Sequence, residues 1–279
     1  MYKHKDISPF VTLSGLAAIL TIFAALMGIF TPDFYPIENE TFVLGAKAQD
    51  IIALAAAILM VWAIVQVWNG STRAVLVWAG CLGYLIYGYL LYSMDKVFTS
   101  LYPLYIAILG LCLYSLIGVL GRLSAEKFRP HVDVHMPRRL IALVLAIPAI
   151  LIPPWIAFAT DPALRTAPNA IITVIVIDLS FVIPACLVCA YLVWKRHIWG
   201  YIFGGVLLVK LFTMGLSLVI ATFWAYFALG TAIDPLQTPI YMAMMLAGGF
   251  AALRYFQHIH DTVEVSKKQT TQTAKALGH

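Results

Sequence analysis

Eight apolar stretches, each long enough to cross a lipid bilayer as a helix, constrain this sequence more than any other feature. A helix rises about 1.5 Å per residue, so about 20 apolar residues cross a hydrocarbon layer of about 30 Å. The stretches cover residues 11–30, 48–68, 74–94, 100–120, 140–159, 170–194, 199–229 and 239–256. They predict an all-α fold, a polytopic bundle of eight transmembrane helices within residues 1–258. Residues 259–279 are polar and predict a disordered cytoplasmic tail.

The composition agrees with a surface that faces lipid. Of the 279 residues, 62% are hydrophobic and only 11% are charged, and the mean hydropathy is +0.90. A soluble domain carries about 25% charged residues because its surface faces water. Membrane lipids are therefore the expected surroundings of most of the chain.

The basic residues predict how the chain is oriented. Of the eighteen Lys and Arg, fourteen fall on one side of the predicted bundle, three on the other, and Lys210 lies within a stretch. The positive-inside rule assigns the basic side, with both termini, to the cytoplasm. We expect the chain to lie in the cell membrane. The basic loop 121–138 then joins two halves, residues 1–120 and 139–258. This distribution accounts for the net charge of +5 without a nucleic-acid partner.

The two halves share a weak pattern. Each has an Asp near the outer end of a stretch (Asp50, Asp178), a Trp at its inner end and a basic turn after it (Arg73, Arg196). This pattern predicts a 4+4 tandem repeat in parallel orientation, an arrangement that transporters use to form a site between halves. The spacings differ between the halves, so chance similarity explains the pattern equally well.

Three ionisable residues, Asp50, Asp178 and Lys210, fall inside the stretches. At about 1.5 Å per residue, Asp178 and Lys210 both lie about 12 to 13 Å from the outer boundary, and Asp50 is shallower. The sequence therefore predicts an Asp178–Lys210 pair on neighbouring helices. One interpretation is a structural pair that fixes helix register. The other is a polar cavity that binds an ion, a proton or a small solute, since ionisable groups inside a membrane are functional candidates.

Tyrosines cluster in the third stretch and the turn that follows it. Their hydroxyls need partners inside hydrocarbon, so Tyr84 and Tyr87 are added to the candidate binding residues. The full cluster is Tyr84, Tyr87, Tyr89, Tyr92, Tyr102 and Tyr105. An interfacial aromatic belt explains the shallow members equally well.

Prolines interrupt the fifth and sixth stretches at Pro148, Pro153, Pro154 and Pro184. Proline removes a backbone donor, so we expect kinks there. Broken helices near the midplane occur in transporters, and proline is also frequent in ordinary membrane helices.

Neither the cysteines nor the histidines form a convincing reactive motif. Cys186 and Cys189 form a CxxC, but they lie far from a helix N-terminus in apolar surroundings, which favours inert packing. His131 and His135 have ligand chemistry, yet a solvated loop is favoured over a metal site. No His falls at mid-span, so a haem is disfavoured. We expect no catalytic residue, no metal and no cofactor.

The outer connection 31–46 contains Asp33, Glu38 and Glu40 among aromatic residues. Such a loop either lies solvated with aromatic anchors or covers a site as a lid, and the solvated loop is favoured.

Several short runs resemble an uncharacterised family of prokaryotic multi-pass membrane proteins. They are Gln49-Asp50, Gly70-Ser71 with Arg73, Leu82-Gly83-Tyr84 to Tyr89, Asp178-Leu179 with Pro184, and Gly200-Tyr201 to Lys210. The resemblance covers the second to seventh stretches and implies a bundle of about eight helices. It implies no activity.

Three functions remain open from the sequence. The first is a small-solute or ion transporter, proton-coupled in one version, that uses Asp178, Lys210, Asp50, Tyr84 and Tyr87. The second is a non-catalytic membrane subunit or sensor that works through its outer acidic loop or basic cytoplasmic loop. The third is a lipid-active membrane enzyme, which no constellation of residues supports.

Overall fold

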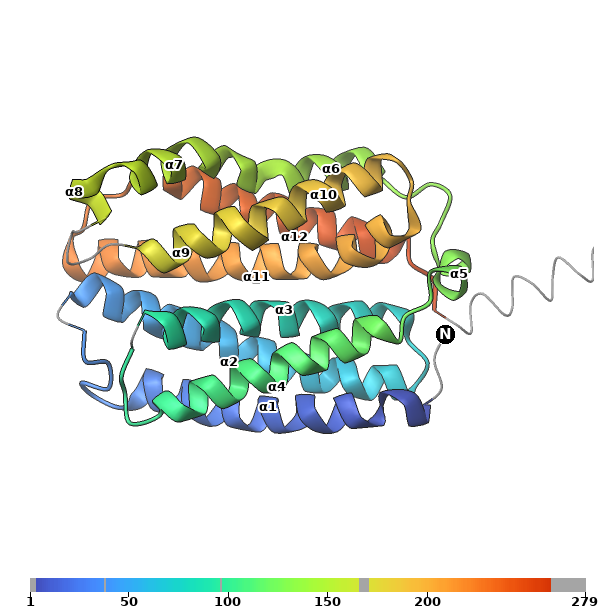
Figure 1. Cartoon of the computed structure of the whole chain (residues 1–279), viewed down its shortest axis with the longest axis horizontal. Coiled ribbons are helices and arrows are strands. Elements are labelled where there is room, and N and C mark those ends of the chain that lie inside the picture. The colour runs from blue at the N-terminus through green and yellow to red at the C-terminus, as the bar shows by residue number, and fades with distance from the viewer. Residues whose placement is uncertain (1–3, 38, 96, 166–170, 262–279) are drawn as a thin grey trace, which may run out of the picture.

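The computed structural model describes residues 4–37, 39–95, 97–165 and 171–261. Of these residues, 83% are helical, and none of them forms a β-strand. The long helices run side by side along the longest dimension of the molecule (Figure 1). The predicted all-α fold is confirmed. Of the predicted tail 259–279, residues 262–279 lie outside the described residues.

Four long helices form the first bundle. They are α1 (His4–Phe30), α2 (Glu40–Trp68), α3 (Thr72–Met94) and α4 (Tyr102–Gly121). Each helix packs against the next, and α4 packs back against α1. The four helices therefore surround a common core.

The start of α2 corrects the prediction for the outer loop 31–46. Asn39 Oδ1 accepts a hydrogen bond of 2.9 Å from the Thr41 backbone N–H, which supplies one of the missing partners of the first helical turn. Glu40 then sits at the positive end of the helix dipole. Residues 40–46 are therefore helical, and the loop is shorter than the sequence suggested.

The remaining long helices form the second bundle. The fifth apolar stretch gives α6 (Arg138–Ala146), η2 (Ile147–Leu151) and α7 (Ile152–Thr160), and the sixth gives α9 (Ile172–Ile177), η3 (Asp178–Val182) and α10 (Ile183–Trp194). They are followed by α11 (Ile198–Leu229) and α12 (Gln237–Gln257). Short helices α5 (Ala125–Phe128), η1 (Arg129–His131) and α8 (Pro162–Arg165) lie in the connections. Here α10 contacts α6 and α11, and α12 contacts α11 and α6.

The predicted interruptions occur at the prolines. Pro148 lies in the 3₁₀ segment η2, and Pro153 and Pro154 open α7. Pro184 is the second residue of α10, which follows the π-helical turn η3. Because proline lacks an N–H and clashes with the carbonyl four residues before it, a tighter or wider turn relieves the clash at each place.

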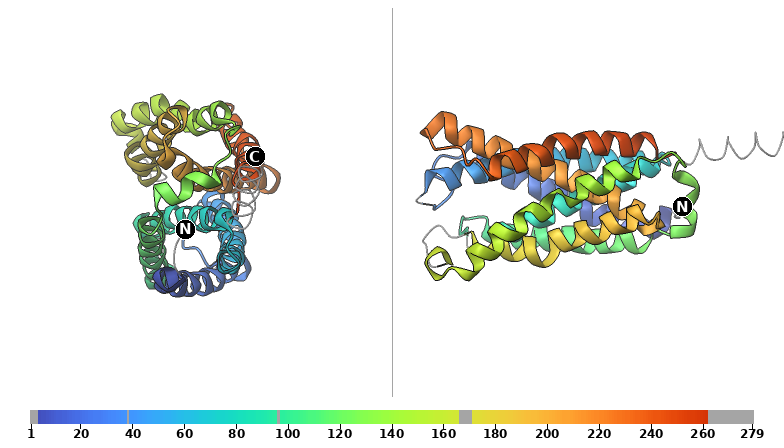
Figure 2. Two further views of the ribbon diagram at one scale, coloured as in Figure 1. Left: turned by 90° about the vertical axis from the view of Figure 1, so that its right-hand side faces the viewer. Right: turned by 90° about the horizontal axis from the view of Figure 1, so that it is seen from above.

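The two bundles meet where α11 packs against α2 and α3, and we call this contact the seam. The left view of Figure 2 shows the bundles as two groups of helices seen end-on. Glycines bring the seam helices close together: a Cβ on Gly80 would lie 2.5 Å from Val209 Cβ, and one on Gly205 would lie 3.0 Å from Leu76 Cδ1. Small residues at helix contacts are typical of membrane bundles.

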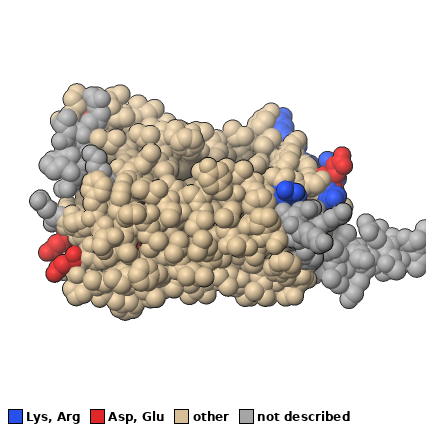
Figure 3. Space-filling view, turned by 60° about the horizontal axis from the view of Figure 1, so that its bottom comes forward, with Lys and Arg blue, Asp and Glu red and all other residues tan. Residues whose placement is uncertain are grey.

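Seven helical stretches of the described residues are long and apolar enough to span a membrane. They are α1 from Ile7, α2, α3, α4, Arg138–Thr160, Ile172–Trp194 and α11. Large apolar side chains such as Ile19, Ile117 and Leu253 are more than half exposed on the outside of the bundles. On the face shown in Figure 3, the Lys, Arg, Asp and Glu side chains lie at the two ends, with an uncharged band between them. A surface of this kind suits lipid rather than water.

The basic end of the molecule is the end where α2 turns into α3 and α10 turns into α11. It carries Arg73, Arg138 and Arg196 and includes the starts of α1 and α6 (Figure 1). The opposite end carries Asp33, Glu40, Asp161 and Asp234. Helix α12 runs beside α11 from the opposite end to the basic end (Figure 1).

Candidate functional site

Asp178 opens the widened turn η3 in the middle of the sixth stretch. Only 2% of this residue is exposed. Trp155 Nε1–H of α7 donates a hydrogen bond of 3.1 Å to one carboxylate oxygen, and the Tyr87 hydroxyl of α3 donates one of 3.2 Å to the other. Two neutral donors from two different bundles therefore hold this carboxylate at the seam.

Lys210 of α11 is 5% exposed and lies on the other side of this network. Its ammonium group lies 4.2 Å from the centre of the Tyr87 ring and 2.9 Å from the Met214 sulfur. Within the part of the chain that the structure describes, no ion pair within 4.0 Å joins it to Asp178. The predicted direct pair is therefore not formed, because Tyr87 lies between the two charges: its hydroxyl faces the carboxylate and its ring faces the ammonium.

A cavity of about 80 Å³ adjoins Asp178. Its walls come from both bundles. The first bundle contributes Gln49, Tyr84, Tyr87 and Leu91, and the second contributes Leu151, Trp155, Val174, Asp178, Met214, Ser217, Leu218, Tyr241 and Met244. A small, mostly apolar cavity with a few polar groups is thus present at the seam, and we call it the Asp178 cavity.

Two of the predicted site residues, Tyr84 and Tyr87, line this cavity together with Asp178. The Tyr84 hydroxyl donates to the Gln49 backbone oxygen at 3.3 Å. Four polar or aromatic lining residues were not among the candidate site residues from the sequence: Gln49, Trp155, Ser217 and Tyr241. Trp155 follows Pro153 and Pro154, a pair that was a local signal for an irregular segment. The other three carry no local signal.

Asp50 lies in a separate site inside the first bundle, where only 1% of it is exposed. The Tyr35 hydroxyl donates a short hydrogen bond to one carboxylate oxygen. The Tyr92 hydroxyl lies 3.1 Å from the other oxygen and 2.9 Å from the Ala46 carbonyl. Gly28 of α1 faces this carboxylate so closely that an added Cβ would overlap Asp50 and Tyr35. The structure does not bring Asp50 to the Asp178 cavity.

The tyrosine cluster divides between the two aspartates. Tyr84 and Tyr87 face the seam, whereas Tyr89, Tyr92 and Tyr105 pack as a group with ring centres 5.2 to 5.9 Å apart. The hydroxyl of Tyr102, on the other hand, donates to the Ser93 carbonyl at 2.8 Å, near the opposite end. These rings therefore serve the Asp50 site and the helix end rather than one common cavity.

A larger groove of about 410 Å³ lies at the opposite end of the molecule. Its walls include Tyr35, Glu40 and Lys47 from the first bundle and Ala228 and Leu229 from the end of α11. Tyr35 therefore contacts both this groove and the Asp50 carboxylate.

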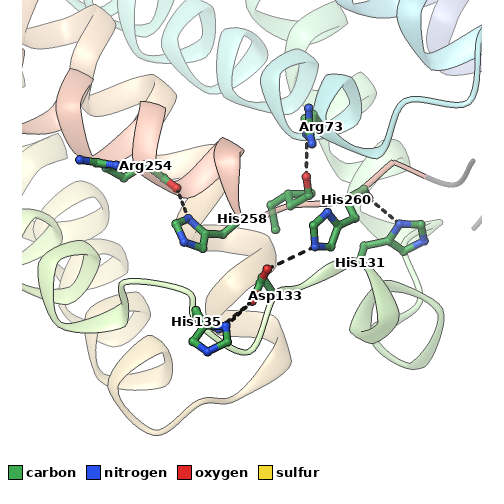
Figure 4. Close-up of polar contacts among 8 residues, drawn as sticks. Arg73, His131, Asp133, His135, Arg254, His258 and His260 are labelled. Carbon is green, nitrogen blue, oxygen red and sulfur yellow. Dashed lines mark hydrogen bonds and ion pairs between the residues drawn. The ribbon is translucent and has the colours of Figure 1, made fainter. Parts of the chain in front are cut away.

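A polar junction ties the bundles together at the basic end (Figure 4). Residues after α12 pair with the loop after η1: the His131 carbonyl accepts from the His260 N–H at 2.7 Å, and the His260 ring lies 3.4 Å from Asp133. Arg73 Nε donates to the Ile259 carbonyl at 2.6 Å. The His135 backbone N–H donates to Asp133, and this bond with the nearby imidazoles holds the pKa of that carboxyl below its usual value.

Asp261 completes this junction. Its carboxylate accepts from the Ser71 hydroxyl at 3.0 Å and from the Thr72 and Arg73 backbone N–H groups at 2.8 and 3.3 Å. A negative charge at a helix N-terminus is favourable, so Asp261 stabilises the start of α3. This contact could not be predicted from the sequence, because about 190 residues separate the partners.

The remaining sequence candidates lie apart from these sites. All four cysteines are buried and free, and the Cys189 thiol donates to the Gly200 carbonyl at 3.4 Å. This supports a packing role for the CxxC. Among the described residues no three His, Cys, Asp or Glu side chains are grouped as metal ligands require.

Comparison with protein-family models, curated proteins and solved structures finds no match for this chain. The resemblance to a family of prokaryotic multi-pass proteins therefore stays a prediction. What the chain does has to be argued from its own geometry.

Proposed function

We propose that this protein is a membrane transporter for a small solute or ion and that the Asp178 cavity is its binding site. One observation carries the proposal: a buried carboxylate lines a cavity whose walls come from both bundles. Burying a carboxylate in a membrane protein is costly, and such groups usually mark the path of a substrate, ion or proton. A seam between two bundles is also where a rocking motion opens a site to either side.

We further propose that the two bundles are a 4+4 repeat. The contacts support it, since in each bundle every helix packs against the next and the last packs against the first. A two-fold axis along the membrane normal would exchange α2 with the sixth stretch and α3 with α11. Because α9 belongs to the sixth stretch, this axis would carry the contact of α11 with α2 onto the contact of α3 with α9. The seam would lie on that axis.

The proposed topology has eight spans in the cell membrane. Helix α12 has 21 residues and packs along α11, which supports a span although it is not among the seven most apolar helices. The excess of Lys and Arg at the basic end supports a cytoplasmic location for that end and for both termini. A reporter fused after Gln257 and one inserted after Asp161 should label from opposite sides.

Proton coupling is part of this proposal, and the contacts of Tyr87 with Asp178 and Lys210 support it. A proton on Asp178 would remove the negative charge from the cavity wall, and so would weaken any cation held there. Lys210, behind the same ring, supplies a second group that can exchange a proton. Binding of a cation and binding of a proton would then compete for the Asp178 carboxylate.

The test measures the flux of small solutes and ions into proteoliposomes made with the purified full chain, with and without an imposed pH gradient. We expect gradient-dependent flux in the wild type and background flux in Asp178→Asn. The matched control is Asp161→Asn. Asp161 is exposed at the opposite end, and asparagine keeps a side-chain oxygen that can accept the hydrogen bond from the Ala163 N–H. Equal flux in wild type and Asp178→Asn, with both proteins folded, contradicts the proposal.

The groove at the opposite end favours a second candidate, a membrane subunit or sensor that binds a partner there. The groove carries both charge signs, through Glu40 and Lys47, beside apolar residues of α2 and α11. A stable partner that co-purifies with the wild type, but not with a Glu40→Lys variant, would favour this candidate over transport.

A further inference from the structure

The walls of the Asp178 cavity combine one carboxylate with several aromatic rings. Tyr84, Tyr87, Trp155 and Tyr241 line it with Asp178, and no Lys, Arg or His does so among the described residues. The face of an aromatic ring is negative and attracts cations, most strongly where water is excluded. Asp178 is the one charged side chain among the described residues of this wall, so the wall attracts positive charge and repels anions.

The protein already holds one ammonium group against this aromatic wall. Lys210 Nζ lies 4.2 Å from the Tyr87 ring centre, within the range of a cation–π contact, although Lys210 itself does not line the cavity. Its other close partner is the Met214 sulfur. An internal primary ammonium thus shows which kind of cation this ring accepts.

The size of the cavity limits the ligand. A volume of about 80 Å³ corresponds to about two or three water molecules at roughly 30 Å³ each. An ammonium ion with one or two carbon atoms fits this space. Most of the wall surface is apolar, which suits the carbon end of such a cation better than a fully hydrated inorganic ion.

We propose that the Asp178 cavity binds a small monovalent organic cation of the primary-ammonium type. The ammonium group lies against the Asp178 carboxylate and the surrounding rings, and the carbon end contacts Met214 and Met244. This inference rests on the proposed function only for the location of the site, because binding can be measured without transport.

Lys210 has a defined part in this proposal. Its positive charge lies behind Tyr87 and opposes a second cation in the cavity. The groups that face it are Asp178 from η3, Tyr87 from α3 and the Cys186 thiol from α10. Removing the charge with Lys210→Met should therefore tighten binding of a cation, whereas a ligand held by Lys210 would bind more weakly.

The experiment is calorimetric titration of the purified full chain in detergent with methylammonium chloride. Sodium chloride and tetramethylammonium chloride are the comparisons. We expect saturable binding of methylammonium, at least about 10-fold weaker binding of tetramethylammonium because of its size, and no binding of sodium. Asp178→Asn should weaken methylammonium binding at least about 30-fold, and Asp161→Asn should leave it unchanged.

A second variant covers the case in which Asp178→Asn does not fold. Ser217→Met keeps every charge and fills the cavity, so it should abolish methylammonium binding in a protein that still elutes as a single species. Absence of binding to the folded wild type overturns the proposal, as does unchanged binding in Ser217→Met. Sodium binding that depends on Asp178, without methylammonium binding, also overturns it.

Flux measurements separate this inference from the proposed function. Binding of methylammonium without any flux would support the ligand assignment and contradict the proposed transport function. Proton-dependent flux that requires Asp178, without methylammonium binding, would support transport and contradict the ligand assignment.

Discussion

Asp50 and Asp178 are chemically alike in this protein, yet Asp178 lines the cavity at the seam and Asp50 does not. Both are buried aspartates in apolar helices, and each accepts two aromatic donors, one of which comes from α3. The partners of Asp50 all belong to the first bundle, and Gly28 lets α1 close over it. The partners of Asp178 come from both bundles and leave a cavity. Burial of a carboxylate is thus compatible with a packed site as well as an open one.

The proposed repeat would make these two aspartates counterparts. The first copy would then have kept the carboxylate as an internal anchor, which holds the outer loop through Tyr35. The second would have kept it as a ligand site. Three pairs of substitutions and one single substitution can break or sharpen this comparison.

The largest difference is expected between Asp178→Asn and Asp50→Asn. Methylammonium flux should fall by about 30-fold or more in the first, because the ligand loses a charged partner. It should stay within about threefold in the second, which instead should unfold at a lower temperature. Flux in proteoliposomes and thermal unfolding in detergent measure the two effects. An equal loss of flux in both variants would show that Asp50 acts in transport.

Gly28→Ala should have the next largest effect, and on stability. The added Cβ would overlap the Asp50 carboxylate and the Tyr35 hydroxyl, so overpacking should lower the free energy of unfolding by about 1 to 3 kcal/mol. Gly83→Ala is the matched control, since its Cβ would meet Lys210 Cγ at an ordinary 4.0 Å. Denaturant unfolding measures both. A neutral Gly28→Ala would mean that the Asp50 site is looser than described.

Removing one hydroxyl from each site should have smaller effects. Tyr87→Phe keeps the ring against Lys210 and removes one donor to Asp178, so methylammonium affinity should fall by about 5-fold. Tyr92→Phe should leave that affinity unchanged and lower the free energy of unfolding by about 1 kcal/mol. Titration calorimetry and unfolding separate the two. If Tyr92→Phe lowered the methylammonium affinity and Tyr87→Phe lowered only the stability, the Asp50 site would be the ligand site and the Asp178 site the structural one.

The smallest effect is expected at Asp133, a carboxylate that lies outside the apolar helices and serves as a reference for both. Its pKa is held below the usual 3.8, so its contribution to stability is present above that pH and is lost as the pH falls further. Asp133→Asn should therefore destabilise the protein by less than about 1 kcal/mol at pH 7. The difference from wild type should shrink below about pH 4. A difference that grows toward low pH would contradict this assignment.

Much of the fold follows from local properties of the sequence. Helix bounds lie within a few residues of the apolar stretches, except at the start of α1 and α2, where polar residues continue the helix toward water. The breaks at Pro148 and Pro184 follow from the missing N–H of proline. Depth along a helix is also a local property, which is why Asp178 and Lys210 were correctly assigned to the same region.

The contacts inside the sites could not be predicted in the same way. Rotation of a helix about its axis decides whether Tyr92 faces Asp50 or the seam, and in lipid an all-apolar helix has no polar face to set that rotation. Partners from distant segments, such as Trp155 for Asp178 and Tyr35 for Asp50, depend on tertiary packing. The 4.2 Å contact that inserts Tyr87 between the two charges depends on it as well.

The carboxylate of Asp261 has a consequence for biosynthesis. A ribosome completes α3 long before it reaches Asp261, which is 189 residues beyond Thr72. Until then the first turn of α3 lacks this partner, and the first bundle has to insert and hold together without it. The junction at the basic end therefore forms only after α12 has been made. Its formation marks the docking of the second bundle against the first.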